Sequence, residues 1–218
     1  MIDYAAARHN MVDGQLRTNG IVDPEHLDAF LSVPRERFVP AALQGTAYVD
    51  RDLPLGNDRY LIEPLVLARL IQLAELRPGA RVLYVGTGPG YDTAILTHLV
   101  GSVIALESDP SLAATARHLL RELDHSNASV IEGPLELGYA AGGPYDAILF
   151  GGAITVVPDA IVRQLAATGR MAAVIRAAGR VSQVTVMTRA GASLSRRPVF
   201  DAATHALPGF APQPAFVF

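Results

Sequence analysis

The amino-acid sequence predicts an α/β fold: a mainly parallel, twisted β-sheet with an antiparallel end, helices on both faces and a small helical cap at the N-terminus. Three observations predict it. From residue 63 to about residue 175, short apolar runs alternate with helical patterns, which is typical of a parallel sheet covered on both faces. Two further apolar runs follow with no helix between them, and the first sixty residues carry helical patterns.

The strands are predicted from brief runs rich in Val, Ile, Leu and Ala, at residues 82–86, 102–107, 129–132, 146–151 and 170–175. The helices before and between them are predicted at residues 64–76, 91–100, 110–122 and 158–167. Residues 181–188 and 197–201 predict two later strands. Because no helix separates these two strands, we expect them to form an antiparallel pair.

The N-terminal segment predicts three short helices and a loop. Apolar residues recur at helical spacing over residues 3–18. Asp23 and Pro24 then supply a cap and a first-turn proline for a second helix. A third helix begins near Pro34, and we expect a loop over residues 50–59, which are punctuated by proline and glycine.

The length of the chain suits one domain with an appendage, and its net charge bears on the partners it could bind. Its 218 residues, 50% of them hydrophobic, are enough to bury one large core. We therefore divide the chain into an N-terminal helical cap with its loop, residues 1–60, and an α/β domain, residues 61–218, within a single globular unit. The net charge of −3 leaves no basic stripe, which argues against a nucleic-acid partner.

Several kinds of chemistry are excluded by what the sequence lacks. It has no cysteine, hence no disulfide, thiolate nucleophile or cysteine zinc site, and it suits a reducing compartment. The six histidines show no paired metal-ligand spacing, and no Gly-x-Ser-x-Gly turn follows a strand.

We expect no secretory signal and no membrane span. The expectation is a cytoplasmic protein without metal or membrane, and the sequence says nothing of its oligomeric state.

A glycine-rich loop follows the first strand of the predicted sheet. Gly86, Gly88 and Gly90 stand at alternate positions in VLYVGTGPGYDTA, residues 82–94. In open α/β sheets ligands bind off the carboxyl ends of the strands, and glycine lets the backbone approach a ligand closely. We therefore expect a ligand at this loop. The alternative is a tight strand-to-helix turn that binds nothing.

The residues around the loop narrow the choice of ligand. The dinucleotide fingerprint requires its third glycine or alanine where this chain has Tyr91, and the phosphate loop of nucleotide hydrolases requires a lysine that this loop lacks. Glu107 ends the second strand, where a carboxylate can accept hydrogen bonds from both hydroxyls of a ribose. Its alternative role is a solvated strand end. The pattern resembles the S-adenosylmethionine (SAM) site of Rossmann-like class I methyltransferases.

Stretches across most of the chain resemble the protein-L-isoaspartate O-methyltransferase family. They are MVDGQLRTNGIVD at residues 11–23, VPRERFVP at 33–40, AYVDRDLPLG at 47–56, VLYVGTGPGYDTAILTHLVG at 82–101 and PYDAILFGGA at 144–153. The resemblance implies methyl transfer from SAM to the free carboxylate of isoaspartyl residues in damaged proteins, so the implied substrate is a protein or peptide carboxylate. Because that carboxylate is already ionised near neutral pH, the transfer requires alignment and no general base.

The resemblance also implies a set of site residues. The implied cofactor-binding residues are Gly86, Thr87, Gly88, Gly90, Tyr91 and Glu107. On the acceptor side, the family's Thr-Ile-Ser-x-Pro places a serine hydroxyl against the substrate carboxylate, and this chain has Ile62 at that serine. Arg59 and Tyr60 stand just before it, and a guanidinium with a phenol can receive a carboxylate instead. The alternative for this pair is a solvated arginine and a packed tyrosine.

Two more departures from the family concern the cofactor. Tyr84 stands where the family's first strand carries an acid near the amino group of SAM, and Pro134 stands where the family carries an acid near the adenine. These departures keep two alternatives open: a non-catalytic relative that serves as a SAM-binding sensor or interaction module, and a methyltransferase with a different small-acid acceptor. The final FAPQPAFVF, residues 210–218, is interpreted as a tail across the domain surface or a lid.

Overall fold

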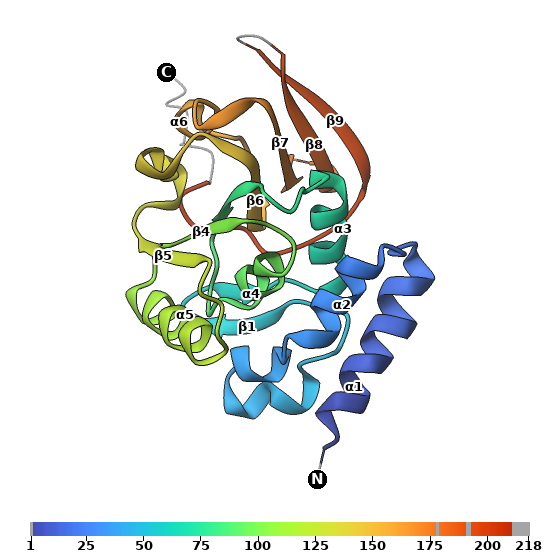
Figure 1. Ribbon diagram of the computed structural model, residues 1–218. Helices are drawn as coiled ribbons and strands as arrows, with labels where there is room; N and C mark the ends of the chain where they lie inside the picture. The colour runs from blue at the N-terminus through green and yellow to red at the C-terminus, as the bar shows by residue number, and fades with distance from the viewer. Residues whose placement is uncertain (1, 178, 191–192, 211–218) are drawn as a thin grey trace.

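The computed structural model of the protein describes residues 2–177, 179–190 and 193–210. Within these residues a seven-stranded sheet has the strand order β5-β4-β3-β6-β7-β8-β9 (Figure 1). Its strands are β3 (Arg81–Val85), β4 (Ser102–Glu107), β5 (Ala128–Glu132), β6 (Tyr145–Ile154), β7 (Leu165–Ile175), β8 (Gln183–Ala190) and β9 (Ser193–Asp201). Neighbours from β5 to β7 pair in parallel, whereas β8 is antiparallel to β7 and to β9. The predicted sheet, with its antiparallel end, is confirmed.

Helices and short turns cover both faces of this sheet. The helices of this part of the chain are α3 (Pro64–Ala74), α4 (Tyr91–Thr97), α5 (Pro110–Glu122) and α6 (Asp159–Val162). Alternate residues of a strand point to opposite faces. Val82 and Tyr84 accordingly belong to the buried cluster that includes residues of α3, α4 and α5, whereas Leu83 and Val85 belong to a second cluster that includes α6.

The N-terminal segment is helical, as predicted, although its first helix changes form along its length. Helix α1 (Tyr4–Met11) is capped by Asp3, whose carboxylate accepts a hydrogen bond from the Ala6 amide at 3.0 Å. It continues as a π-helical turn (Val12–Leu16) and a 3-10 turn (Arg17–Asn19), which ends at the left-handed Gly20. Helix α2 (Pro24–Ser32) follows, and the third helix consists of two 3-10 segments (Arg35–Phe38 and Ala41–Thr46).

The loop expected over residues 50–59 contains a β-hairpin, so that prediction is wrong. Strand β1 (Leu53–Gly56) pairs antiparallel with β2 (Arg59–Leu61). The two residues between them, Asn57 and Asp58, both have positive φ angles near 50°, the backbone of the tight turns that connect hairpin strands. Strands of three and four residues give too short an apolar alternation to be read from sequence. The hairpin carries Arg59 toward the carboxyl ends of the main sheet.

The helix predicted over residues 158–167 is much shorter in the structure. Helix α6 ends at Val162, and β7 begins at Leu165, which pairs with Tyr145 of β6. The Tyr145 amide donates to the Gln164 carbonyl at 2.8 Å, and the Gln164 side chain donates to the Leu137 carbonyl at 2.7 Å. These contacts fix the chain beside the sheet at residue 164, so the helical pattern of the sequence is interrupted by tertiary pairing.

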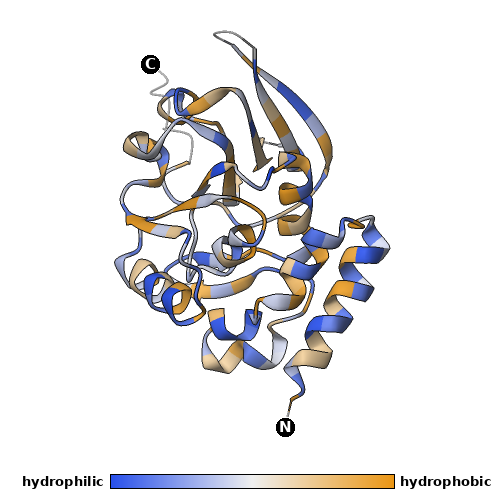
Figure 2. Cartoon of the chain, viewed as in Figure 1, coloured by the Kyte–Doolittle hydropathy of each residue, from blue (hydrophilic) through white to orange (hydrophobic). Residues whose placement is uncertain are grey.

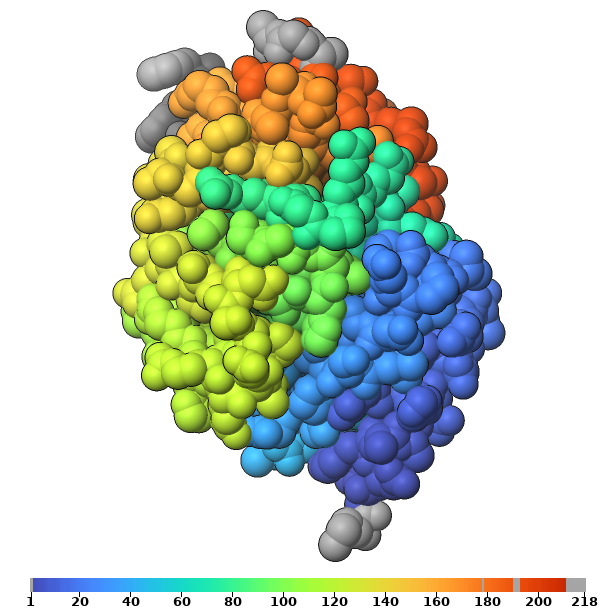
Figure 3. Space-filling model, viewed as in Figure 1, coloured from blue at the N-terminus to red at the C-terminus, as the bar shows by residue number. Residues whose placement is uncertain are grey.

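The N-terminal segment and the sheet share one core. Phe30 of α2, Leu67 of α3 and Leu149 of β6 belong to the same cluster of buried side chains. Figure 2 shows orange, apolar residues alternating with blue, hydrophilic ones along the N-terminal helices. In Figure 3 the blue N-terminal residues form one end of the particle and lie directly against the green central part of the chain. Among the described helices, none is long and apolar enough to cross a bilayer.

The shared core predicts that the two parts of the chain unfold together. Phe30 is fully buried, and its replacement by alanine removes a large apolar side chain from the common cluster. We expect Phe30→Ala to lower the free energy of unfolding by about 3–5 kcal/mol, in a single transition followed by circular dichroism and tyrosine fluorescence. Val22→Ala, at a residue that is 71% exposed, serves as the control and should change it by less than about 0.5 kcal/mol. Two separate transitions would contradict a shared core.

Candidate functional site

The glycine-rich loop lies where the carboxyl ends of β3 and β4 meet. The amides of Gly86 and Thr87 both donate to the Leu106 carbonyl, at 2.8 and 3.1 Å. Gly86, Gly88 and Gly90 have φ angles of +85°, +56° and +102°, which residues with a side chain rarely adopt. The loop is thus a tight strand-to-helix turn that requires glycine, whatever ligand it holds.

The space next to each glycine is occupied by another part of the chain. A Cβ atom on Gly90 would lie 3.2 Å from the Cβ of Ala116, so this glycine lets α5 pack against the turn. A Cβ atom on Gly86 would lie 2.6 Å from a methyl carbon of Leu207, and one on Gly88 would lie 3.1 Å from a methyl carbon of Leu55. The space beside Gly86 is therefore occupied by Leu207 in this structure, and the space beside Gly88 by Leu55.

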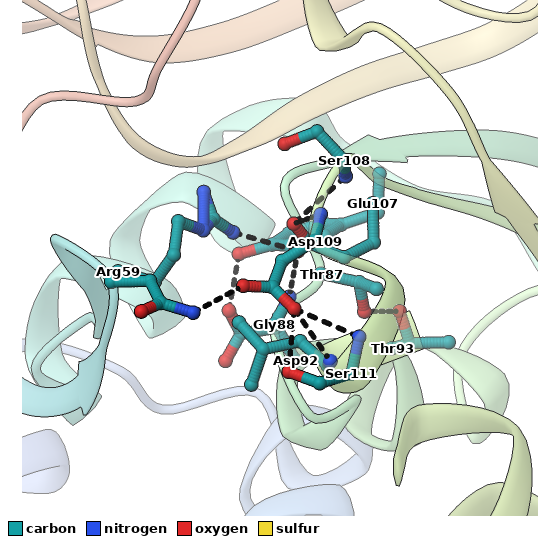
Figure 4. Close-up of polar contacts among 12 residues, drawn as sticks. Arg59, Thr87, Gly88, Asp92, Thr93, Glu107, Ser108, Asp109 and Ser111 are labelled. Carbon is teal, nitrogen blue, oxygen red and sulfur yellow. Dashed lines mark hydrogen bonds and ion pairs between the residues drawn. The ribbon is translucent and has the colours of Figure 1, made fainter. Parts of the chain in front are cut away.

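The carboxylate of Glu107 is fully buried and binds four donors among the described residues. One oxygen accepts from the Gly88 amide at 2.6 Å and from the Arg59 guanidinium at 2.7 Å. The other accepts from the amides of Ser108 and Asp109, at 2.8 and 3.0 Å. Figure 4 shows Arg59 reaching from its strand to this carboxylate. A carboxylate offers about four acceptor positions, so those of Glu107 are in use.

Arg59 is buried beside the loop and is not solvated. Its side chain is 3% exposed, and its Nη2 makes the ion pair with Glu107. Its Nε is buried and has no hydrogen-bond partner among the described residues. The guanidinium thus has one strong charged partner and one unsatisfied donor, in a place where desolvation of a charge is costly.

The other expected cofactor residues take part in contacts within the protein. The hydroxyls of Thr87 and Thr93 lie 2.7 Å apart. The ring of Tyr91 is fully buried, with the Arg35 guanidinium 4.7 Å from its centroid and the edge of Phe38 against it. The Tyr91 hydroxyl has no partner among the described residues, and burial raises its pKa. These residues support the turn from the side of the core.

Tyr84, at the position where the resemblance implies an acid, has a fully buried ring. Its hydroxyl donates to the carboxylate of Asp92 at 2.5 Å. A Cβ atom on Gly151 would lie 3.1 Å from the Tyr84 oxygen, so this glycine of β6 leaves room for the phenol. Burial, the largest effect, raises the pKa of Asp92 to about 6, although the Tyr84 hydrogen bond and the charge of Arg35 lower it.

A segment near the C-terminus, residues 204–210, lies across the loop, and we call it the C-terminal strap. Its first end is bound by Asp52, whose Oδ2 accepts from the Thr204 hydroxyl at 2.7 Å and from the His205 amide at 2.9 Å. In its middle, the Leu207 amide donates to the Ala153 carbonyl of β6 at 2.8 Å. The strap brings Leu207 over Gly86. Of the predicted tail, residues 211–218 lie outside the described part of the chain.

The acceptor-side candidates lie along β2 and the start of α3. The ring of Tyr60 stacks on that of His205 in the strap, with centroids 3.4 Å apart. Ile62 is 1% exposed, and its carbonyl accepts from Arg35 at 2.8 Å. Burial, with smaller contributions from nearby Asp50 and Asp52, raises the pKa of Glu63 to about 7. Near neutral pH a fraction of Glu63 is therefore protonated, which reduces its repulsion of an anion.

Two members of the site were not predicted as such from the sequence. Asp52 and Leu207 come from segments separated by about 150 residues: Asp52 lies in the family-like stretch AYVDRDLPLG, where no role was assigned to it, and Leu207 lies in none of the quoted stretches. The proline and glycine around Leu207, in LPGF, are the one local signal that the chain turns there. The structure brings Arg59 and Glu107 together, which were singled out for different roles. Among the described residues, no group of three or more His, Asp or Glu could hold a metal ion.

In this structure, parts of the protein itself occupy the contacts that the resemblance assigns to SAM. A ribose at Glu107 would need acceptor positions that Arg59, Gly88, Ser108 and Asp109 already use. A ligand over Gly86 would collide with Leu207. The loop residues from Gly86 to Gly90 are all buried. The residue types suit a cofactor, and among the described residues Arg59 and Leu207 lie at the positions that it would use.

The buried Asp92 predicts a pH-dependent contribution to stability. Its folded-state pKa of about 6 lies above its ordinary value of 3.8, so the folded state binds the proton more tightly than the unfolded state. Stability from this group is then present at about pH 4 and is lost as the pH rises through 6. We expect Asp92→Asn, measured against wild type by urea unfolding, to become relatively more stable by about 2–3 kcal/mol between pH 4 and pH 7.

The control for this experiment is Asp28→Asn, at an exposed aspartate of α2. The free energy of unfolding of Asp28→Asn, measured against wild type, should change little between pH 4 and pH 7. A difference between Asp92→Asn and wild type that stays constant from pH 4 to pH 7 would contradict the raised pKa of Asp92.

Comparison with known proteins agrees with the resemblance of the sequence. The model of the protein-L-isoaspartate(D-aspartate) O-methyltransferase family matches residues 7–200. A protein-L-isoaspartate O-methyltransferase from Koribacter versatilis is 40% identical over 168 residues, which are 77% of this chain and 76% of that protein.

Solved structures share the fold. One protein-L-isoaspartate O-methyltransferase superposes with a TM-score of 0.82 at 24% identity, over 93% of this chain; the chain spans 66% of the length of that relative. Another, from Plasmodium falciparum and in complex with S-adenosyl-L-homocysteine, superposes with a TM-score of 0.76 at 21% identity, over 95% of this chain and 99% of the other. The extent of the family match decides the assignment: this chain belongs to the protein-L-isoaspartate(D-aspartate) O-methyltransferase family, a family of SAM-dependent enzymes.

Proposed function

We propose that this protein transfers a methyl group from SAM to a carboxylate oxygen, and that its acceptor is the isoaspartyl carboxylate of a damaged protein or peptide. The observation that carries the proposal is the family match over residues 7–200, together with 40% identity to a protein of that name. The cytoplasm is the compartment we propose for this reaction, in keeping with a chain that has no cysteine.

The acceptor is proposed to bind where the N-terminal cap, residues 1–60, meets the α/β domain, residues 61–218. Tyr60 is half-buried there and presents a phenol beside His205. An acceptor carboxylate is ionised at neutral pH, so no group has to remove a proton from it. The protein then needs to hold the acceptor in line and to exclude water, and the partial protonation of Glu63 lowers the charge that the anion meets.

A second candidate is methyl transfer to a different small acid. Ile62 favours it, because its side chain offers no hydrogen bond to a carboxylate at the position of the family's serine. Both candidates use the same cofactor, and they differ in the acceptor alone.

The test is formation of a base-labile methyl ester from SAM and a synthetic isoaspartyl peptide, followed by mass spectrometry. We expect ester on the isoaspartyl peptide and none on the matched peptide with an ordinary aspartate. Ester on small organic acids without ester on the isoaspartyl peptide would replace the first candidate by the second. Binding of SAM without transfer to any acceptor would contradict both candidates and would indicate a sensor.

Ile62 provides a further prediction about the acceptor. Restoring a hydroxyl with Ile62→Ser supplies a hydrogen bond to a charged acceptor, worth about 1.5–3 kcal/mol, so we expect kcat/KM for the isoaspartyl peptide to rise at least about tenfold over Ile62→Ala. The alanine variant is the matched control, since both substitutions remove the buried side chain. Equal kcat/KM values for the two variants would mean that residue 62 does not contact the acceptor.

A further inference from the structure

Two side chains from separate elements block the same place at the glycine-rich loop. Arg59 comes from the β1–β2 hairpin and Leu207 from the C-terminal strap. A Cβ atom built on Gly86 would lie 2.6 Å from Leu207 and 3.4 Å from the Arg59 Nη2, so both stand over one glycine. Neither residue belongs to the seven-stranded sheet that fixes the loop itself.

Arg59 meets Glu107 at the point where a ribose would bind. Its Nη2 donates to the Glu107 oxygen that also accepts from Gly88. The hydroxyls of a ribose are donors too, so the guanidinium and the nucleoside need the same acceptor positions. Occupation of Glu107 by Arg59 and by a ribose is therefore mutually exclusive.

We propose that Arg59 and Leu207 act as a latch: they hold the cofactor site closed, and SAM binds after the Arg59–Glu107 ion pair has separated and Leu207 has moved from Gly86. This inference rests on the proposed function, because it concerns the cofactor of that reaction. It makes Arg59 a residue that sets the affinity for the cofactor.

The latch is held by one ion pair and by the contacts that the hairpin and the strap make with their surroundings. The ion pair is buried, but the Nε of Arg59 has no partner, so the guanidinium is desolvated without full compensation. Outside the hairpin's own pairing, its turn is joined to the N-terminal end of α5 by an exposed hydrogen bond from Asn57 to Asp109, at 2.8 Å. The strap crosses β6 through two hydrogen bonds with Ala153, which form one isolated bridge, and through a hydrogen bond from the Thr155 hydroxyl to the Phe210 carbonyl. The strap is not a strand of the seven-stranded sheet, and segments of this kind open locally at lower free energy than a core strand, whereas the hairpin is anchored by the buried Leu53 and Leu61.

The latch has a measurable consequence for binding. When a fraction of the molecules is competent, the apparent dissociation constant is the intrinsic one divided by that fraction. Removing a closing side chain raises the fraction, so the apparent affinity rises although no contact to the ligand is gained. We expect Arg59→Gln and Leu207→Ala each to bind S-adenosylhomocysteine at least about tenfold more tightly than wild type, by isothermal titration calorimetry.

Matched controls separate the latch from general effects of substitution. Arg37→Gln removes an exposed arginine that pairs with Glu122, and Leu137→Ala shortens a leucine that is 55% exposed. Both should bind S-adenosylhomocysteine as wild type does. Hydrogen exchange of the ligand-free proteins gives a second readout: the amides of Gly88 and Leu207 should exchange faster in Arg59→Gln and Leu207→Ala than in wild type and the controls.

The outcomes separate the latch from the proposed function. Tighter binding by both variants, with faster exchange at Gly88 and Leu207, supports the latch. Binding by the variants that is equal to or weaker than that of wild type overturns it, and ester formation by wild type would then leave the proposed function standing. Absence of binding in wild type and in both variants overturns the latch and the proposed function together. If Arg59→Gln does not fold, the affinity of Leu207→Ala for S-adenosylhomocysteine tests the latch by itself.

Discussion

The carboxylate of Glu107 ties together the parts of the chain that make the site. It has no exposed surface, and its partners are the glycine-rich loop through Gly88, the turn after β4 through Ser108 and Asp109, and the β1–β2 hairpin through Arg59. A buried charge is tolerated when it is paired and fully hydrogen-bonded. One acid therefore joins the loop, the turn after β4 and the hairpin.

A second buried charge joins the N-terminal cap to the site. Arg35 is fully buried; its Nε donates to the Ala47 carbonyl and its Nη2 to the Ile62 carbonyl, both at 2.8 Å. Its guanidinium also lies over the ring of Tyr91 at the start of α4. Arg35 thus links the cap, the acceptor-side segment and the helix that follows the glycine-rich loop. Through Arg35 the cap is in direct contact with the residues around the glycine-rich loop.

Much of this architecture could be predicted from local pattern. The five central strands, α3 and α5 follow from apolar periodicity, and α2 follows from its aspartate cap and its proline. The hairpin could not be predicted in this way, because strands of three and four residues carry too little periodicity. The length of α6 could not either, since the contacts of Gln164 that end it involve residues far along the chain.

The site was predictable in its composition and less so in its arrangement. Glycines that need positive φ angles and an acid at a strand end are visible in a single sequence. The donors that Glu107 binds depend on the packing of the chain. Arg59, for example, is 48 residues before Glu107 in the sequence and donates to its carboxylate. Leu207 belongs to no motif, so its place over Gly86 follows from the path of the strap.

The pairing of Tyr84 with Gly151 has a consequence for how this sequence can vary. A side chain at position 151 would meet both the Tyr84 ring and the backbone oxygen of Gly86. A substitution at either of these two positions therefore changes the packing of the other. The changes in the free energy of unfolding that the two substitutions cause will not be additive. An acid restored at position 84 would leave the space beside Gly151 unfilled. The Gly86 carbonyl oxygen alone lies 2.4 Å from where a Cβ at position 151 would be, so Gly151 has to stay a glycine whatever side chain stands at position 84.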